Sequence, residues 1–245
     1  MAVLETEALV LRTYNLAEAD KIVVCLTRGS GLIRAVAKGS RRLKNRFGAA
    51  LEPFTLLNVS CYQKENQELI SLRQAEILQS HFTLLGDAEL LTGLAYMGDL
   101  LIDFSPPYQR NEKLFRMVKA CLETVAACPA DLNAVLRYFE VWLLKLEGFL
   151  PDLNRCGECN RSLKEGELVY LGADLTLRCG DCYGGQGFPL SRVVHSHLRA
   201  THRLSPSVFA AEFRPVPSKI KKEMADFTRQ LIGRVLEREP RVKLN

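Results

Sequence analysis

The stretch from Lys21 to Leu51 contains no aspartate or glutamate. Its cations carry a formal charge of +8, three more than the +5 of the whole chain, so the remaining residues are net acidic. A cationic surface this local implies either an anionic partner or a purely solubilising role. The cations are Lys21, Arg28, Arg34, Lys38, Arg41, Arg42, Lys44 and Arg46.

The chain also lacks the features of export and of membrane insertion. No apolar run approaches the ~18 residues of a membrane span, and Glu5 and Glu7 stand where a signal peptide has lysine or arginine. We therefore expect a cytoplasmic protein with no membrane partner. The apolar fraction of 47% is enough for ordinary globular cores. Without export, the eight cysteines should stay reduced.

Motifs of catalysis are missing as well. The chain has no Gly-x-x-x-x-Gly-Lys-[Ser/Thr] loop and no His-x-Glu, and the cationic stretch has no carboxylate to hold a nuclease metal. Asp99 and Asp103 are four residues apart and share a predicted helix face, which we interpret as a solvated face rather than a carboxylate pair. His195, His197 and His202 have no accompanying nucleophile or acid. We expect no enzymatic activity.

The densest cationic segment runs from Lys38 to Gly48 and has the composition of a loop. Gly39 and Gly48 let a backbone approach a ligand closely, guanidinium groups suit phosphate oxygens, and Phe47 offers a face on which a base could stack. A solvated loop is the alternative interpretation. We therefore expect a nucleic acid as the ligand, and the candidate binding residues are Arg34, Lys38, Arg41, Arg42, Lys44, Arg46 and Phe47.

Residues 5–79 have the alternating, β-branched pattern of strands. Turn signals separate the strands, for example at residues 28–31 and 64–67. Five short strands in ~80 residues fit a small closed barrel of the OB-fold type, and an SH3-like barrel would show the same pattern. The cationic stretch falls on the second and third strands and on the connection to the fourth. The predicted strands cover residues 8–11, 22–26, 32–37, 54–59 and 69–72.

After Ser80 the apolar period changes from two to 3.6, which predicts helices. We expect three of them at residues 87–104, 111–125 and 132–146, and an amphipathic helix between Val216 and Val235. Trp142, the single tryptophan, lies in the apolar stripe of the third helix, and we expect it in the core.

Four of the cysteines are paired. Nineteen residues separate the pair Cys156-x-x-Cys159 from the pair Cys179-x-x-Cys182, which is the spacing of a four-cysteine zinc site. Four thiolates fill the tetrahedral coordination of Zn²⁺ and leave no position for water or substrate, so the expected zinc is structural. Metal-free thiols or an iron–sulfur cluster are the alternatives.

Three segments of the chain resemble the RecO family of bacterial recombination mediators. The first begins Glu18-Ala-Asp-Lys-Ile-Val and is followed by Leu26-Thr27 and Gly31. The second is Lys38-Gly-Ser-Arg-Arg-Leu-Lys-Asn-Arg-Phe-Gly-Ala-Ala-Leu-Glu-Pro-Phe-Thr-Leu-Leu, and the third is Glu147-Gly-Phe-Leu-Pro-Asp-Leu-Asn-Arg-Cys-Gly-Glu-Cys. Asn45 stands where family members often have serine.

The resemblance implies an α+β multidomain protein with an N-terminal five-stranded OB-fold barrel and a C-terminal helical domain with an inserted four-cysteine zinc module. The expected domains are an OB-fold at 1–80, a helical domain at 81–152 and 189–245, and a zinc module at 153–188.

The resemblance also implies a function. Such proteins bind single- and double-stranded DNA, anneal complementary strands without ATP, engage the C-terminal tail of single-stranded-DNA-binding protein, and act with RecR to load RecA. Nucleoid association when bound to DNA would follow. A zinc-containing, sequence-specific transcriptional regulator is the alternative class.

Overall fold

The computed structural model describes residues 2–63, 70–242 and 244. The chain forms two compact units, one of residues 1–122 together with 241–245 and one of residues 123–240. The second unit is therefore inserted in the sequence of the first. The boundary between them falls inside the helical domain that the sequence predicts. Among the described residues, no helix has the length and apolarity needed to cross a bilayer.

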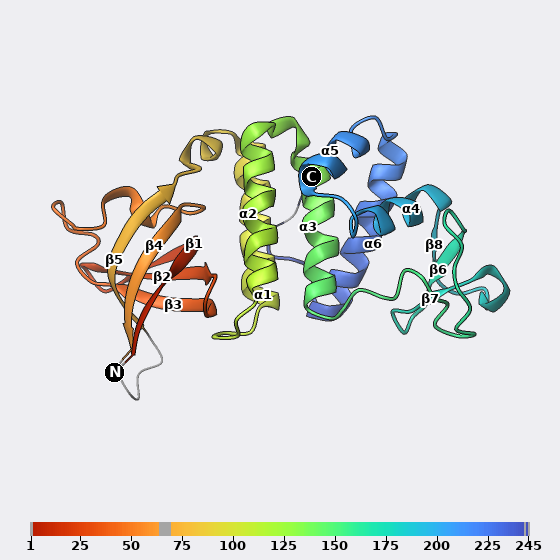
Figure 1. Cartoon of the computed structure of the whole chain (residues 1–245), viewed down its shortest axis with the longest axis horizontal. Coiled ribbons are helices and arrows are strands. Elements are labelled where there is room, and N and C mark those ends of the chain that lie inside the picture. Colours follow the sequence, from red (N-terminus) through yellow and green to blue (C-terminus); the bar gives the residue numbers. More distant parts are fainter. Residues whose placement is uncertain (1, 64–69, 243, 245) are drawn as a thin grey trace. The chain divides into compact units, whose positions relative to one another are not determined.

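The first unit contains a closed barrel of five strands (Figure 1). Around the barrel the order is β1-β2-β3-β5-β4, and all neighbours are antiparallel except β3 and β5. This order is that of the OB-fold and confirms the predicted barrel. The strands are β1 (Ala2–Leu16), β2 (Asp20–Thr27), β3 (Gly31–Ala37), β4 (Leu56–Gln63) and β5 (Ile70–Gln79).

Alternation along the strands builds the barrel core. On β3, Ile33, Ala35 and Ala37 are buried inside the barrel, whereas Arg34 between them is exposed. The predicted turn after β2 is present: the Thr27 hydroxyl donates to the Gly31 carbonyl (2.8 Å). The predicted turn at 64–67 and the first residue of the predicted fifth strand lie outside the described residues.

Helix α1 (Ala88–Phe104) follows the barrel, and α2 (Glu112–Ala127) begins in the same unit. The Asp87 carboxylate caps α1 by accepting hydrogen bonds from the backbone N–H groups of Glu89 (2.8 Å) and Leu90 (3.0 Å). Both helices match the predicted ranges closely.

The predicted solvated face of α1 is wrong. The side chain of Asp99 is 2% exposed and pairs with Arg12 of β1, and that of Asp103 is 8% exposed and pairs with Arg241 at 3.2 Å. The two carboxylates are shielded because their side of α1 faces the barrel and the C-terminal residues. They hold the first unit together and do not form a joint site.

The second unit packs helices around aromatic side chains. Its α-helices are α3 (Leu132–Leu146), α4 (Arg192–Ala200), α5 (Pro206–Phe213) and α6 (Ser218–Leu236). Phe139 of α3, Phe209 and Phe213 of α5 and Phe227 of α6 are fully buried. Trp142 packs against Tyr138 and donates its indole N–H to the Thr201 carbonyl (2.8 Å), but it is half-buried, at the edge of the predicted core.

A small three-stranded sheet belongs to the same unit. It has the order β7-β6-β8 and consists of β6 (Val169–Leu171), β7 (Leu177–Arg178) and β8 (Phe188–Leu190). Strands this short are marginal without further support. Of the four paired cysteines, three lie on loops around this sheet and Cys182 ends a short 3-10 helix, Gly180–Cys182.

Candidate nucleic-acid interface and metal centre

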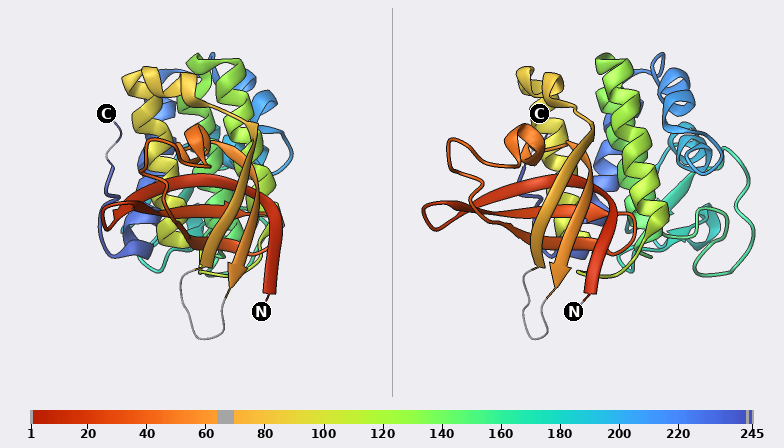
Figure 2. Two further views of the ribbon diagram at one scale, coloured as in Figure 1. Left: turned by 90° about the vertical axis from the view of Figure 1, so that its left-hand side faces the viewer. Right: turned by 60° about the vertical axis from the view of Figure 1, so that its left-hand side comes forward.

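The connection from β3 toward β4 forms a loop, residues 38–48, which we call the basic loop. Two hydrogen bonds hold it beside the β1–β2 turn: the Arg41 backbone N–H donates to the Ala19 carbonyl (3.0 Å), and the Gly39 N–H donates to the Asp20 carboxylate (2.8 Å). Figure 2 shows the loop at this end of the barrel. Gly39 and Gly48 have φ of +71° and +51°, a conformation that favours glycine.

Asn45 closes the far side of the basic loop. Its carboxamide oxygen accepts the N–H groups of Phe47 (2.9 Å) and Gly48 (2.8 Å), and its amide nitrogen donates to the Arg42 carbonyl (3.1 Å). Sequence reasoning gave Asn45 little weight, although asparagine often bonds to backbone two residues ahead. The loop is thus held by its own side chain as well as by the barrel.

Phe47 does not have the role predicted from the sequence. Its side chain is 4% exposed and belongs to the barrel core, so it offers no face to a base. Arg46 covers the ring from outside, with its guanidinium carbon 4.8 Å from the ring centroid, and donates to the Leu72 carbonyl (3.2 Å). Phe47 therefore anchors the loop in the barrel core. The prediction that its ring stacks on a base is wrong.

The structure brings four of the six predicted DNA-binding cations together around one pocket of about 640 Å³. Arg41 donates instead to the Ala17 carbonyl (2.9 Å), and Arg34 lies on the outer face of β3; neither lines this pocket. All six are exposed. The pocket is lined by Asp20, Lys38, Gly39, Arg42, Lys44, Asn45 and Arg46.

The cations of the basic loop form no ion pairs among the residues that the structure describes, although Asp20 lines the same pocket. Within residues 2–63, 70–242 and 244, none of the six cations forms an ion pair with a carboxylate. Arg28 differs, because it pairs with Glu7 (3.1 Å) and Glu112 (2.9 Å). Hydrogen bonds from Arg28 and then Arg110 lower the pKa of Glu112. The unpaired charge of the acid-free stretch is therefore concentrated at the loop.

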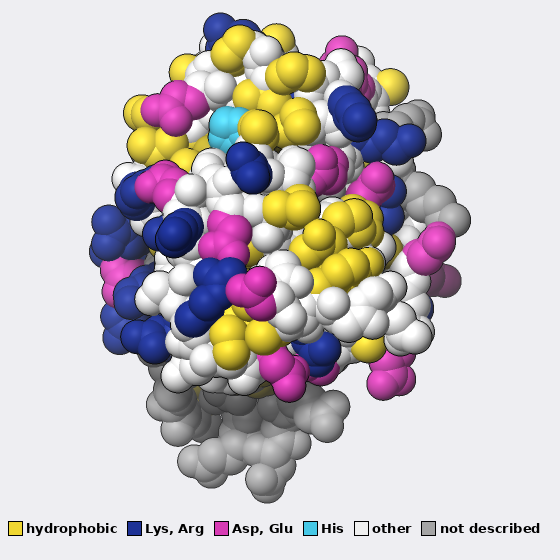
Figure 3. All heavy atoms as spheres, turned by 90° about the vertical axis from the view of Figure 1, so that its right-hand side faces the viewer, with side chains coloured by type: hydrophobic (Ala, Val, Ile, Leu, Met, Phe, Trp, Pro, Cys, Tyr) yellow, Lys and Arg dark blue, Asp and Glu magenta, His cyan; other side chains and the backbone are white. Residues whose placement is uncertain are grey.

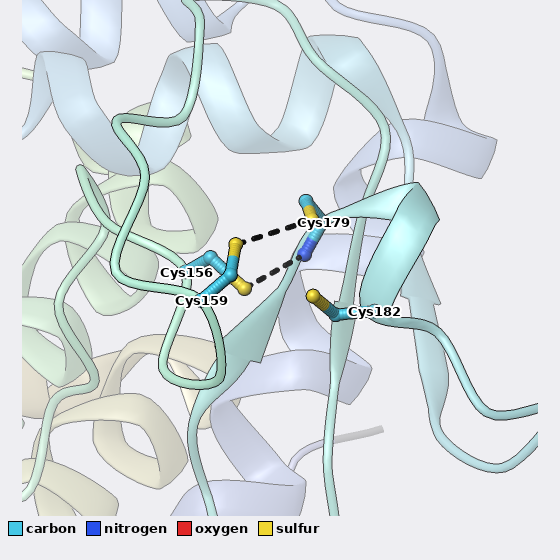
Figure 4. Close-up of side chains that lie close together, drawn as sticks. All are labelled: Cys156, Cys159, Cys179 and Cys182. Carbon is cyan, nitrogen blue, oxygen red and sulfur yellow. Dashed lines mark hydrogen bonds between the residues drawn. The ribbon is translucent and has the colours of Figure 1, made fainter.

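The four paired cysteines converge on one point of the second unit (Figure 4). Their Sγ atoms all lie within 4.8 Å of one another, and those of Cys159 and Cys179 are 3.9 Å apart. Cys156 and Cys179 are buried, whereas Cys159 is exposed. Four thiolates about 2.3 Å from a tetrahedral ion would be separated by about 3.8 Å. The cluster therefore fits a single metal ion.

The local backbone favours the thiolate form at Cys156, whereas hydrogen bonds from Cys159 and Cys179 raise the pKa of Cys182 to about 12. Burial alone raises the pKa of Cys156, but hydrogen bonds from the backbone at Cys159, Cys179 and Glu158 outweigh it and lower this pKa to about 6. A thiolate is the form that binds metal. The first knuckle also requires glycine, since a Cβ at Gly157 would lie 2.5 Å from the Thr176 Cβ.

Charges around the cysteines are paired with one another. Arg178 lies 3.1 Å from Asp174 and 3.5 Å from Glu158, and Arg161 pairs with Glu167. On the face drawn in Figure 3, acidic and basic side chains are interspersed. This region therefore resembles ordinary charged surface, in contrast to the basic loop.

The histidines of α4 and the following turn do not join the cluster. His195 is fully buried, with Nε2 2.8 Å from the Leu153 carbonyl oxygen. His197 packs edge-on against Phe213, and His202 packs edge-on against Trp142. These positions are structural.

Comparison with known proteins gives consistent matches along the chain. A profile described as "Recombination protein O N terminal" matches residues 1–81, and one described as "Recombination protein O C terminal" matches residues 85–244. DNA repair protein RecO of Koribacter versatilis is 36% identical over 161 residues, covering 66% of this chain and 65% of that protein. The protein of the same name from Thermodesulfovibrio yellowstonii is 33% identical over 178 residues, covering 73% of this chain and 70% of the relative.

A longer match, at 26% identity over 224 residues, is with DNA repair protein RecO of Anaeromyxobacter sp. strain Fw109-5, and it covers 91% of this chain and 87% of that protein. The two profiles follow the architecture, with one on the barrel and the other on the helices and the cysteine cluster. The chain belongs to the RecO family of DNA repair proteins.

Proposed function

We propose that this protein is a recombination mediator that binds single- and double-stranded DNA and anneals complementary strands without ATP. Acting with RecR, it would help load RecA onto strands coated by single-stranded-DNA-binding protein. The observation that carries the DNA-binding part is the basic loop, whose exposed cations surround one pocket and form no ion pair with a carboxylate of the described residues. Membership of the RecO family supports the proposal that RecR and single-stranded-DNA-binding protein are its partners.

Annealing would follow from charge neutralisation. Two DNA strands repel through their phosphates, and cations held on a rigid barrel reduce that repulsion where the strands meet. Base pairing then supplies the driving force, so no nucleotide hydrolysis is needed. The protein holds, aligns and releases the strands.

The salt dependence of binding should report the number of phosphate contacts. If Lys38, Arg42, Lys44 and Arg46 each neutralise one phosphate of a single strand, log affinity falls with log salt at a slope near −3, from about 0.7 per contact. Arg34 and Arg41 lie on the same barrel and can add contacts with a longer strand.

We also propose that the metal is zinc, held by Cys156, Cys159, Cys179 and Cys182. The all-thiolate donor set and the spacing of the sulfur atoms suit a closed tetrahedral site. When bound, the ion supplies cross-linking of the loops rather than chemistry. The cysteines would thereby stabilise the short strands β6 and β7.

The deciding experiment is annealing of labelled complementary strands, precoated with single-stranded-DNA-binding protein, in the absence of ATP. The test variant replaces Lys38, Arg42, Lys44 and Arg46 by alanine. A charge-matched control replaces four exposed cations elsewhere, Lys113, Arg116, Lys219 and Lys222. We expect the wild type and the control to accelerate annealing and the test variant to lose most of the acceleration.

The same proteins should be compared for salt slope. A flatter slope in the test variant alone would locate the phosphate contacts at the basic loop. Equal losses in test and control would argue against it, and no acceleration by wild-type protein would contradict the mediator role.

A further inference from the structure

Leu43 lies at the centre of the basic loop with its side chain fully exposed. Its neighbours Arg42 and Lys44 both line the cationic pocket. A single exposed leucine on a protein surface needs no explanation. Leu43 differs because it is an apolar side chain set among the cations that we assign to DNA phosphates, where solvation of the loop would favour a polar residue.

The turn that carries Leu43 is held in place on both sides. The Arg42 backbone N–H donates to the Gly39 carbonyl (3.1 Å), and the Arg42 carbonyl accepts from the Asn45 side chain (3.1 Å). Arg41 is tied to Ala19 through its backbone and to Ala17 through its guanidinium. Leu43 is therefore presented at a defined place relative to the pocket, which lowers the ordering cost of any contact it makes.

We propose that Leu43 is the base-contacting residue of the loop and packs against an unpaired nucleobase of a strand whose phosphates occupy the cationic pocket. This inference rests on the proposed DNA binding. A strand that directs its phosphates toward Arg42 and Lys44 carries bases within reach of the side chain between them. Leucine is among the side chains that wedge against bases in other DNA-binding proteins.

The contact gives the loop a preference that charge alone lacks. In a continuous duplex the base faces are stacked and buried, so Leu43 finds no apolar partner. In a single strand, or at a junction, a base face is available and its contact with Leu43 removes apolar surface from water. The cations set overall affinity, whereas Leu43 favours unpaired over paired DNA.

The test uses the full-length protein with Leu43→Gln, which keeps length and charge and removes the apolar contact. Because the side chain is fully exposed, the change should leave folding intact. Leu78→Gln, at a half-exposed leucine of β5, is the matched control. Affinities are measured for an unstructured oligothymidine and for a relaxed, covalently closed circular duplex, which has no ends and no unpaired bases.

We expect Leu43→Gln to weaken binding to the oligothymidine about fivefold, in line with partial burial of one leucine. Binding to the closed duplex should change less than twofold, and the salt slope should be that of the wild type. Leu43→Phe, with a larger apolar face, should bind the single strand at least as tightly as the wild type.

Three results would overturn the proposal. An unchanged single-strand affinity in Leu43→Gln would remove the base contact, and an equal loss on both DNAs would remove the preference. Slower annealing on coated strands with unchanged affinity for naked strands would assign Leu43 to a protein partner instead. In each case the alanine variant of the four pocket cations tests separately whether the basic loop binds DNA at all.

Discussion

Asn45 is the residue that joins the two ends of the basic loop, since its side chain bonds to Arg42, Phe47 and Gly48. Asn45→Ala should therefore accelerate amide hydrogen exchange at Phe47 and Gly48 and lower DNA affinity about threefold, because the pocket cations lose their preorganisation. Exchange is measured by mass spectrometry and affinity by fluorescence anisotropy.

Asn45→Asp separates the two effects of that residue. A carboxylate still accepts both N–H groups, so exchange should stay slow, while its negative charge should weaken DNA binding. Unchanged exchange in Asn45→Ala would show that the loop is held without this side chain.

The pair of Arg12 and Asp99 should be more important for stability than the exposed pairs nearby. Arg12→Met leaves the carboxylate of Asp99, which is 2% exposed, without its cation, and should cost about 3 kcal/mol of unfolding free energy in the first unit. Arg28→Met, at a cation 48% exposed, should cost much less, because solvent screens its ion pairs. Urea denaturation followed by circular dichroism compares the two, and equal costs would contradict the expected effect of burial.

The residues that sequence reasoning misplaced share one cause. Phe47 and Asp99 were interpreted from their neighbours in the chain, yet each is buried by segments distant in sequence. Leu43 was passed over because an isolated leucine has no pattern. The six cations were identified as exposed because a dense cluster of like charge cannot be buried. Local composition therefore located the loop but not which of its apolar residues is exposed.

At the scale of elements, the cysteine region should depend on its metal. Chelation of the purified protein is expected to open residues 153–188 to limited proteolysis, because β6 and β7 are too short to persist without cross-links. The barrel strands should keep their protection. Metal content is measured by elemental analysis, and about one zinc per chain is expected.

Single substitutions test the ligand set without a chelator. Cys159→Ser should release the metal, whereas Cys128→Ser, at a cysteine outside the cluster, should retain it. Full metal content in Cys159→Ser would exclude the four-thiolate site.

The elements themselves were largely predictable, with a physical limit at their ends. Apolar alternation identified all five strands, and the 3.6-residue period identified α1, α2 and α3. The second half of β5 escaped detection because its residues are mostly exposed and it is held by backbone pairing with β4. Closure through the parallel β3–β5 pair depends on contacts between distant segments, which no local pattern reports.

The stability of the whole molecule should depend on pH, because acid should lower the unfolding free energy of the second unit through two of its histidines. Burial and the nearby Lys145 lower the pKa of His202 to about 4, and burial lowers the pKa of His197. Between about pH 6.5 and 4 the unfolded chain binds protons that the folded chain does not, so stability is present above that window and lost as the pH falls through it. Allowing for partial exposure, His202 should account for 1–2 kcal/mol, on the order expected from its shift.

Fluorescence of Trp142 reports on this unit specifically, since it is the single tryptophan. His202→Phe preserves an aromatic contact with Trp142 and should reduce the slope of stability against pH, leaving the part due to His197. An unchanged slope would assign the acid sensitivity to other groups.

The ion pair between Asp103 and Arg241 has a consequence for biosynthesis. A ribosome makes Asp103 before the inserted unit and Arg241 after it, so this contact cannot form until the entire inserted unit has been made. The barrel and α1 are therefore synthesised before Arg241, the residue that pairs with Asp103. During that interval Asp103 has not yet gained Arg241 as its partner. The inserted unit is therefore synthesised completely before the last residues of the first unit.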